Sequence, residues 1–241
     1  MQISGNKILI TGGATGIGFG LAERFISEKN TVIICGRRES SLKDAKDKLH
    51  SLITRVSDLS VTHEREELLA WITKEHSDLN VLVNNAGIQQ LMGISDNNFY
   101  QRAKEEIAIN VEAPLHLISL FQQLNSLRTI INITSGLSFT PLAKAPVYSA
   151  TKAFFHSFTL SLRYLLRSKN IEVIELIPPA LNTDLGGKGI HDSCPPVSAF
   201  IETAFEQLSQ GKDVATFGFS EAMINAGPRE LQKAFERMNP S

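Results

Sequence analysis

The chain has 241 residues and a formal net charge of −1, because 24 Lys plus Arg are balanced by 25 Asp plus Glu. Hydrophobic residues make up 42% of the chain and charged residues 20%, a mixture typical of soluble globular proteins and not of disordered ones. The sequence has no dense basic run, so it lacks the electrostatic field that binding to nucleic acid or to an anionic membrane requires. We therefore expect a small-molecule partner.

The two cysteines and the N-terminal residues indicate a cytoplasmic protein. Cys35 lies in an apolar run and Cys194 in a polar, proline-containing one, so we interpret both as free thiols in a reducing compartment. Residues 1–5 do not combine a basic start with a long apolar stretch, and the sequence nowhere has 18 successive apolar residues. We therefore expect neither secretion nor membrane insertion.

Short apolar runs alternate with longer helical patterns along the whole chain. The runs span residues 8–10, 32–35, 81–83, 130–133 and 173–177, with weaker candidates at 52–56 and 214–217. They are typical of buried parallel strands, and the gaps between them are long enough for crossover helices. The pattern predicts one α/β domain over residues 1–241, a doubly wound parallel sheet with helices on both faces and a ligand crevice at the carboxyl ends of the strands.

The second half of the chain contains two long helical patterns and one irregular segment. A helix is predicted within residues 96–125, with Pro114 as the expected kink, and another over residues 146–168. Between residues 182 and 198 glycines and prolines interrupt the periodicity for longer than a compact connector usually does. This segment is either a lid over the crevice or a plain surface loop.

A glycine-rich turn follows the first predicted strand. Residues 11–18 read Thr-Gly-Gly-Ala-Thr-Gly-Ile-Gly and lead directly into a helical pattern. Glycines at such a position permit close approach of a pyrophosphate, whose charge is favoured by the free N–H groups at the start of the helix. The alternative is a turn without a ligand. We expect this segment to bind a nucleotide through Gly12, Ala14, Thr15, Gly16, Ile17 and Gly18.

The end of the second predicted strand indicates which dinucleotide is bound. An NAD-specific site usually has a carboxylate there, to hold the ribose 2′-hydroxyl, whereas this chain has Arg37 and Arg38 after Gly36. A guanidinium matches the geometry of a 2′-phosphate. We predict that Arg37 binds this phosphate and that NADP(H) is preferred over NAD(H). The alternative is that one Arg or both point to solvent from the next helix, as we expect of Arg38.

Tyr148 and Lys152 lie four residues apart and would share one face of the predicted helix. A free tyrosine has a pKa near 10, and a cation within roughly 4 to 6 Å can lower it by about 1 to 3 units. Such a pair is suited to general acid–base catalysis, although Tyr and Lys at this spacing are commonly bystanders on an exposed helix face.

Several motifs in order resemble the short-chain dehydrogenase/reductase family, over residues 7 to about 185. The motifs are the glycine-rich turn, the run Asn84-Asn85-Ala86-Gly87, Asn110, Ser135, and Tyr148 with Lys152. Residues 147–152 and the tail at 235–239 are most similar to oxidoreductases found beside teichoic-acid D-alanylation genes in Gram-positive bacteria. The resemblance implies a Rossmann-type domain, with residues 1–90 forming mainly the cofactor half and residues 91–241 the catalytic half with its substrate loop.

The same resemblance implies further cofactor contacts. Asp58 would accept a hydrogen bond from the adenine and Leu59 would offer a backbone contact, although Asp58 could equally be a turn or N-cap residue. Asn85, Ala86 and Gly87 would line the adenosine side, and an asparagine here could also brace neighbouring loops. Pro178 and Thr183 belong to the stretch beside the nicotinamide, where Pro179 replaces the usual glycine.

For catalysis, the resemblance implies a set formed by Asn110, Ser135, Tyr148 and Lys152. Ser135 would polarise a substrate carbonyl, and Asn110 would lie at a helix kink whose backbone holds a water connected to the lysine. We predict hydride exchange between a carbonyl and a secondary alcohol without metal, by a homodimer or homotetramer. The alternatives are a non-catalytic NADP(H) sensor and another family reaction, such as epimerisation or dehydration. We interpret His116, His156 and His191 as surface or packing residues, because they lack metal-ligand spacing.

Overall fold

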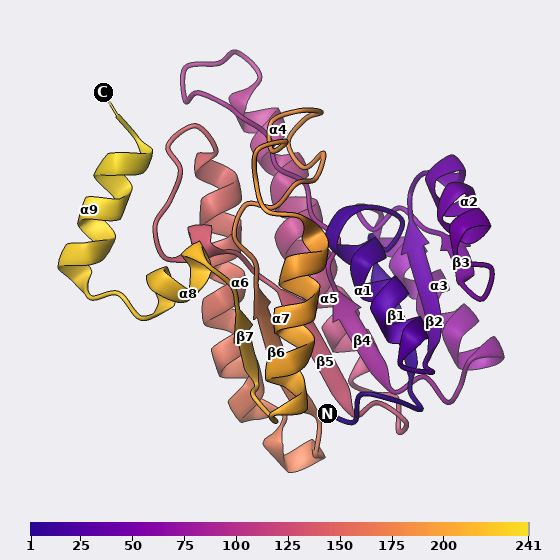
Figure 1. Ribbon diagram of the computed structural model, residues 1–241. Coiled ribbons are helices and arrows are strands. Elements are labelled where there is room, and N and C mark those ends of the chain that lie inside the picture. Colours follow the sequence, from indigo (N-terminus) through magenta and orange to yellow (C-terminus); the bar gives the residue numbers. More distant parts are fainter. Residues whose placement is uncertain (241) are drawn as a thin grey trace.

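The computed structural model describes residues 1–240, and within them seven parallel strands form one sheet in the order β3-β2-β1-β4-β5-β6-β7 (Figure 1). The strands are β1 (Lys7–Thr11), β2 (Thr31–Gly36), β3 (Ile53–Val56), β4 (Val81–Asn84), β5 (Thr129–Ile133), β6 (Glu172–Ile177) and β7 (Val214–Thr216). All five strong predictions and both weak ones coincide with observed strands. The order reverses between β1 and β4, which places a ligand crevice at the carboxyl ends there.

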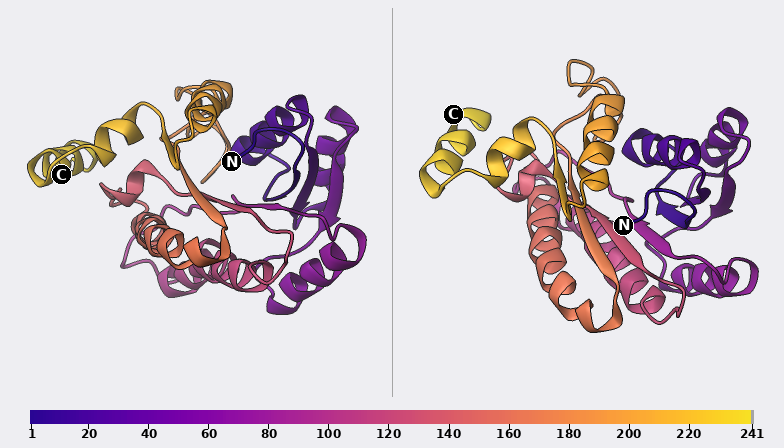
Figure 2. Two further views of the ribbon diagram at one scale, coloured as in Figure 1. Left: turned by 90° about the horizontal axis from the view of Figure 1, so that it is seen from below. Right: turned by 60° about the horizontal axis from the view of Figure 1, so that its bottom comes forward.

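The central strands are apolar on both faces because helices cover both sides of the sheet (Figure 2). One face packs against α1 (Gly16–Ser27), α2 (Glu39–Lys48) and α7 (Val197–Ser209), with Phe25 and Phe205 in edge contact at 4.8 Å. The other packs against α3 (Thr62–Glu75), α5 (Ala113–Phe121) and α6 (Pro146–Leu165). The predicted doubly wound α/β fold is therefore confirmed.

The helical segment predicted within residues 96–125 is continuous but irregular. It consists of α4 (Phe99–Ile107), a π-helical turn (Ala108–Glu112) and α5. The Ala113 N–H donates to the carbonyl of Ala108, five residues earlier. Pro114 has no N–H to donate to the Asn110 carbonyl, so the regular ladder is interrupted at this point. The irregularity thus precedes the proline and centres on Asn110.

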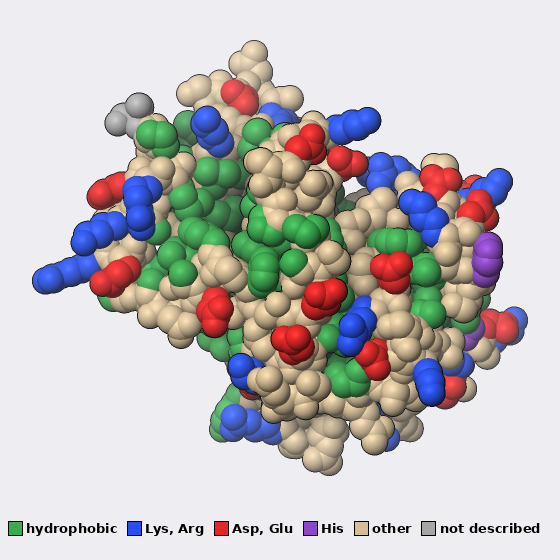
Figure 3. Space-filling view, viewed as in Figure 1, with side chains coloured by type: hydrophobic (Ala, Val, Ile, Leu, Met, Phe, Trp, Pro, Cys, Tyr) green, Lys and Arg blue, Asp and Glu red, His purple; other side chains and the backbone are tan. Residues whose placement is uncertain are grey.

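Residues 178–196 connect β6 to α7 without a helix or strand, so the irregular segment predicted at 182–198 is present but ends two residues earlier, where α7 begins at Val197. The segment closes on itself, because the Asn182 N–H donates to the Pro195 carbonyl at 2.8 Å. After β7, α8 (Phe219–Ile224) and α9 (Pro228–Met238) lead the chain to one edge of the molecule (Figure 1). Hydrophobic side chains gather in the hollow between α9 and α7 (Figure 3). Within residues 1–240, every helix is too short or too polar to cross a bilayer.

Candidate active site

The glycine-rich turn packs directly against the segment that follows β4. Gly12 has a φ of +62°, and a β-carbon there would lie 2.9 Å from Ala86 Cα. The side-chain amide of Asn85 donates to the carbonyls of Thr11 (2.9 Å) and Gly12 (3.1 Å). Asn85 therefore braces the turn, as its alternative interpretation predicted. The close approach of the two segments requires glycine.

The start of α1 fits a phosphate group. In the described chain Thr15 occupies the N-cap position without a capping side-chain hydrogen bond, so the first N–H groups of the helix are free to bind an anion. Thr183 lies close by, because a β-carbon on Gly16 would be 3.4 Å from Thr183 Cγ2. The structure thus brings the predicted nicotinamide-side residue to the glycine-rich turn, although the two are far apart in the sequence.

The predicted adenosine-side residues lie at the ends of β2 and β3. Arg37 and Arg38 are both exposed and connect β2 to α2. Asp58 follows β3 and accepts hydrogen bonds from the N–H (3.0 Å) and hydroxyl (2.7 Å) of Ser60, so it has the local turn role that was one of its two interpretations. Leu59 is buried, and its carbonyl accepts from Arg65 Nη1 at 3.1 Å.

Tyr148 and Lys152 are buried on the face of α6 that meets the end of β5. The Lys152 ammonium donates to the Ile133 carbonyl at 2.8 Å and lies 5.7 Å from the centre of the Tyr148 ring. Ser135 follows the same strand, and its hydroxyl shares a hydrogen bond with that of Tyr148. The three residues are therefore assembled although they come from two elements.

The ionisation of the pair differs from the sequence-based expectation. Burial raises the pKa of Tyr148 well above that of a free tyrosine; the hydrogen bond to Ser135 lowers it, and the negative charge of Glu106 raises it further. Burial also lowers the pKa of Lys152 to about 8. The predicted lowering of the tyrosine pKa by Lys152 is therefore wrong for this structure, because loss of hydration disfavours the charged form of both groups.

Asn110 is buried in the π-helical turn and holds the loop after β4. Its Oδ1 accepts from the Ile88 N–H at 2.9 Å, and its Nδ2 donates to the Ile88 carbonyl (2.8 Å) and to the Thr151 hydroxyl (3.1 Å). A β-carbon on Gly87 would lie 3.4 Å from Asn110 Oδ1 and 3.8 Å from Lys152 Nζ. Asn110, Gly87 and Lys152 therefore meet at one point.

A small cavity of about 10 Å³ lies beside this meeting point. Its polar lining includes the side chains of Thr11, Asn84, Asn110 and Lys152. Among residues 1–240, Asn84 Oδ1 has no hydrogen-bond partner although it is buried. The volume is at the lower limit of what one water molecule needs, and the lining offers the partners that such a molecule requires.

Pro178 lies next to Ser135. Its carbonyl accepts a hydrogen bond from the Gly136 N–H at 3.1 Å, and Ser135 Oγ accepts from the Leu137 N–H at 3.1 Å. The end of β6 is thus held against the short 3₁₀ turn (Gly136–Ser138) that follows β5. The stretch predicted beside the nicotinamide therefore adjoins Ser135.

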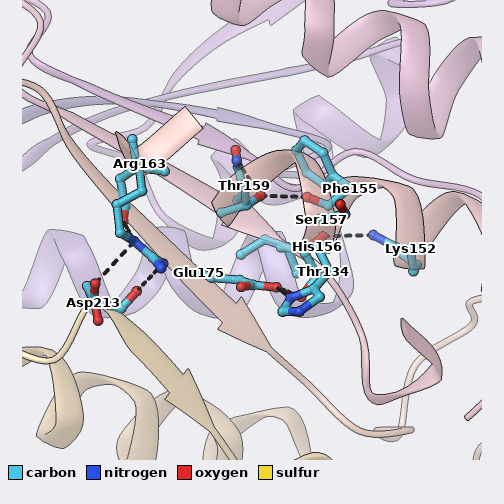
Figure 4. A network of polar contacts seen from close by, with 12 residues as sticks. Thr134, Lys152, Phe155, His156, Ser157, Thr159, Arg163, Glu175 and Asp213 are labelled. Atoms are coloured by element: carbon cyan, nitrogen blue, oxygen red, sulfur yellow. Dashed lines mark hydrogen bonds and ion pairs between the residues drawn. The ribbon is translucent and has the colours of Figure 1, made fainter. Parts of the chain in front are cut away.

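Sequence reasoning missed two buried carboxylates. Glu106 on α4 accepts a hydrogen bond from the Gln90 N–H at 2.5 Å, and burial raises its pKa to about 7. Glu175 on β6 contacts His156 Nδ1 at 2.8 Å, so His156 is more than a surface or packing residue (Figure 4). The available signals were a Glu one helical turn before Asn110 and a Glu inside an otherwise apolar strand. Within residues 1–240, no three His, Cys, Asp or Glu side chains gather as a metal site would require.

The sequence profile described as short chain dehydrogenase matches residues 6–192. The chain belongs to the short-chain dehydrogenase family. It is 39% identical to the "Uncharacterized oxidoreductase DltE" of Bacillus subtilis (strain 168) over 253 residues, covering 99% of this chain and 98% of the relative. It is 32% identical to the "NADP-dependent 3-hydroxy acid dehydrogenase YdfG" of Escherichia coli O6:H1, covering 71% of each chain. These relatives confirm the predicted family and the closer resemblance.

Solved short-chain dehydrogenases share the fold of this chain almost end to end. A short chain dehydrogenase from Burkholderia cenocepacia J2315 in complex with NADP has a TM-score of 0.85 and 22% identity, with 99% of each chain covered. A family member from Burkholderia phymatum in complex with NAD has a TM-score of 0.84 and 18% identity, covering 100% of this chain and 98% of the other. The likeness confirms the Rossmann-type fold, and both dinucleotides occur among these structures.

Proposed function

We propose that this oxidoreductase uses NADP(H) to interconvert a carbonyl compound and a secondary alcohol, in a single domain whose residues 1–90 mainly bind the cofactor. The observation that carries the proposal is the assembly of Ser135, Tyr148 and Lys152 at the end of β5, next to the glycine-rich turn. A nucleotide-binding fold alone would not imply catalysis. These side chains, however, provide a proton donor, Tyr148, together with the hydroxyl and the ammonium group that would assist it. A sensor would need only the turn.

The residues that would hold the cofactor line the carboxyl ends of the strands. Gly12 to Gly18 and the start of α1 would bind the pyrophosphate, Arg37 the 2′-phosphate, and Lys152 the nicotinamide ribose. When bound, the nicotinamide supplies the hydride chemistry. The exposed Arg37 and the NADP-dependent relative YdfG support NADP(H), whereas the NAD-bound neighbour shows that fold alone does not choose.

The side chains of the protein donate the proton and replace it. In reduction, Tyr148 donates its proton to the carbonyl oxygen while the Ser135 hydroxyl hydrogen-bonds the same atom. Because burial raises the pKa of Tyr148 above that of a free tyrosine, the phenol stays protonated at ordinary pH, as a proton donor must. Lys152 and Asn110 line the same cavity, which supports a role in returning a proton from solvent. The hollow of hydrophobic side chains beside α9 supports a moderately apolar substrate (Figure 3).

The test is Tyr148→Phe, with NADPH consumption measured against a panel of ketones, aldehydes and 3-oxo acids. Loss of the proton donor should lower kcat by about 10²- to 10⁴-fold while NADPH binding is kept. Tyr100→Phe, at an exposed tyrosine on α4, is the matched control and should leave kcat unchanged. Full turnover by Tyr148→Phe would refute the mechanism. NADPH binding by a wild-type protein that reduces no compound of the panel would favour a sensor.

We further propose a cytoplasmic homodimer or homotetramer. The outer face of α6 leaves Phe154, Leu160 and Leu165 between 44% and 64% exposed, and a partner subunit would cover them. Light scattering of the purified protein gives the mass directly. A monomer at micromolar concentration would refute the assembly without affecting the proposed chemistry.

A further inference from the structure

Glu175 is a charged residue within a buried strand. Its side chain is fully buried on β6, between the apolar residues Ile174 and Leu176. Its Oε1 accepts a hydrogen bond from the Thr134 hydroxyl at 2.6 Å and lies 2.8 Å from His156 Nδ1, while Oε2 has no partner among residues 1–240. A carboxylate in this position costs stability compared with an apolar residue. Packing alone therefore does not explain its presence.

Thr134 lies between Ile133 and Ser135, the two residues at the end of β5 that hydrogen-bond Lys152 and Tyr148. The preceding residue, Ile133, accepts the Lys152 ammonium on its carbonyl, and the following residue, Ser135, hydrogen-bonds Tyr148. The backbone N–H of Thr134 donates to the Leu176 carbonyl at 3.0 Å, and its hydroxyl donates to Glu175. Because Thr134 is tied to β6 through backbone and side chain, its position fixes that of both neighbours.

His156 connects the same carboxylate to the catalytic helix. It lies one turn after Lys152 on α6, with its side chain 20% exposed and its ring against the edge of Phe139 at 4.7 Å. Thr134 and His156 both meet the carboxylate end of Glu175 (Figure 4). One carboxylate oxygen thus joins the end of β5 to the helix that carries the proton donor.

We propose that Thr134, Glu175 and His156 form a positioning unit that holds the catalytic side chains of β5 and α6 in register for turnover. The proposal rests on the reductase function proposed above. The three residues act through Ile133 and Ser135 and do not contact the reacting atoms. A displacement of about 1 Å in a catalytic constellation is enough to lower the rate about 100-fold.

The sharpest test is a pair of nearly isosteric substitutions at Thr134. Thr134→Val removes the hydroxyl donor and keeps the shape, whereas Thr134→Ser keeps the hydroxyl. Thr159→Val is the matched control, because the Thr159 hydroxyl is equally buried on α6, accepts from Asn132 of β5 (2.9 Å) and donates to the Phe155 carbonyl (2.7 Å), and neither partner belongs to the proposed unit. Both valine variants remove a buried side-chain hydrogen bond to a strand. Thr134→Val loses the bond to Glu175 of β6, and Thr159→Val loses the bond from Asn132 of β5.

Thr134→Val should lower kcat about 10- to 100-fold and leave the KM for NADPH within about twofold, because geometry and not cofactor binding is lost. Thr134→Ser and Thr159→Val should keep the wild-type kcat. At His156, Asn can place its amide where Nδ1 lies, so His156→Asn should keep more activity than His156→Leu. Equal kcat values for Thr134→Val and Thr159→Val would overturn the proposal.

A second measurement does not depend on turnover. Hydrogen exchange at the amides of residues 134–138, followed by mass spectrometry, should become faster in Thr134→Val and remain unchanged in Thr134→Ser and Thr159→Val. A purely structural role would accelerate exchange throughout the sheet instead, and unchanged exchange would also overturn the proposal. If the wild-type protein reduces no carbonyl compound, the reductase function fails, and exchange at residues 134–138 alone decides on the positioning unit.

Discussion

Gly18 and Asn85 are in contact: a β-carbon on Gly18 would lie 2.5 Å from Asn85 Nδ2. That amide holds the glycine-rich turn through the carbonyls of Thr11 and Gly12. Gly18→Ala should therefore displace Asn85 and raise the Kd for NADPH by about tenfold or more, the equivalent of one charge-assisted hydrogen bond. Fluorescence titration measures it. Gly227→Ala, where only the flexible end of Glu230 is in the way, should not change the Kd.

Lys152 should titrate near pH 8 in the protein without cofactor. Its pKa lies below that of free lysine because of burial, so the ammonium is present below pH 8 and is lost above it. We expect the rate of carbonyl reduction to fall as the pH rises past about 8, if the ammonium supports catalysis. Lysine-selective ¹⁵N NMR gives the pKa, and stopped-flow kinetics give the pH profile. A Lys152 resonance that titrates above about pH 10, the range of free lysine, would contradict the expectation.

Arg37 should determine the choice of cofactor. Arg37→Ala should weaken NADPH binding by about 10- to 100-fold, because a charged hydrogen bond to the 2′-phosphate is lost, and should leave NADH binding unchanged. Arg38→Ala is the adjacent control and should have little effect. Calorimetric titration of both cofactors measures the affinities. If Arg37→Ala weakened the binding of NADPH and NADH equally, Arg37 would not bind the 2′-phosphate.

Glu106 should make the protein less stable as the pH rises. Its pKa is about 7 in the folded protein, against 4.5 for an unperturbed glutamate, so the folded state binds the proton more tightly. The free energy of unfolding should fall between about pH 4.5 and 7, by up to about 3 kcal/mol. Glu106→Gln should remove this loss and be relatively more stable at about pH 8 than at about pH 5. Urea unfolding measures it, with Glu105→Gln, at an exposed neighbour, as the control.

The strands and the pairing of Tyr148 with Lys152 on one helix could be predicted because their signals are local or have fixed spacing. Apolar runs between helical patterns define β1, β2, β4, β5 and β6, and the interval of four between Tyr148 and Lys152 places both on one helix face. The glycines after β1 likewise predict a tight turn before a helix. These features depend on neighbours in the sequence.

The buried carboxylates and the ionisation of the site could not be predicted in the same way. Glu106 contacts Gln90 and Glu175 contacts His156 only because distant segments pack together. The spacing of Tyr148 and Lys152 indicates proximity but not burial, and burial decides the direction of both pKa shifts. The π-helical turn at Asn110 also depends on the loop that it holds, not on Pro114 alone.

The hydrogen bond between the Asn182 N–H and the Pro195 carbonyl holds the two ends of the intervening segment together. Because Thr183 and Gly186 approach the glycine-rich turn and Gln89, residues can be inserted or deleted between positions 187 and 194 without shifting β6 or α7. This part of the segment can thus be exchanged while the sheet and the helices around it stay unchanged. Under the proposed function, variation between positions 187 and 194 would offer evolution, or an engineer, a route to new substrates that leaves Tyr148 untouched.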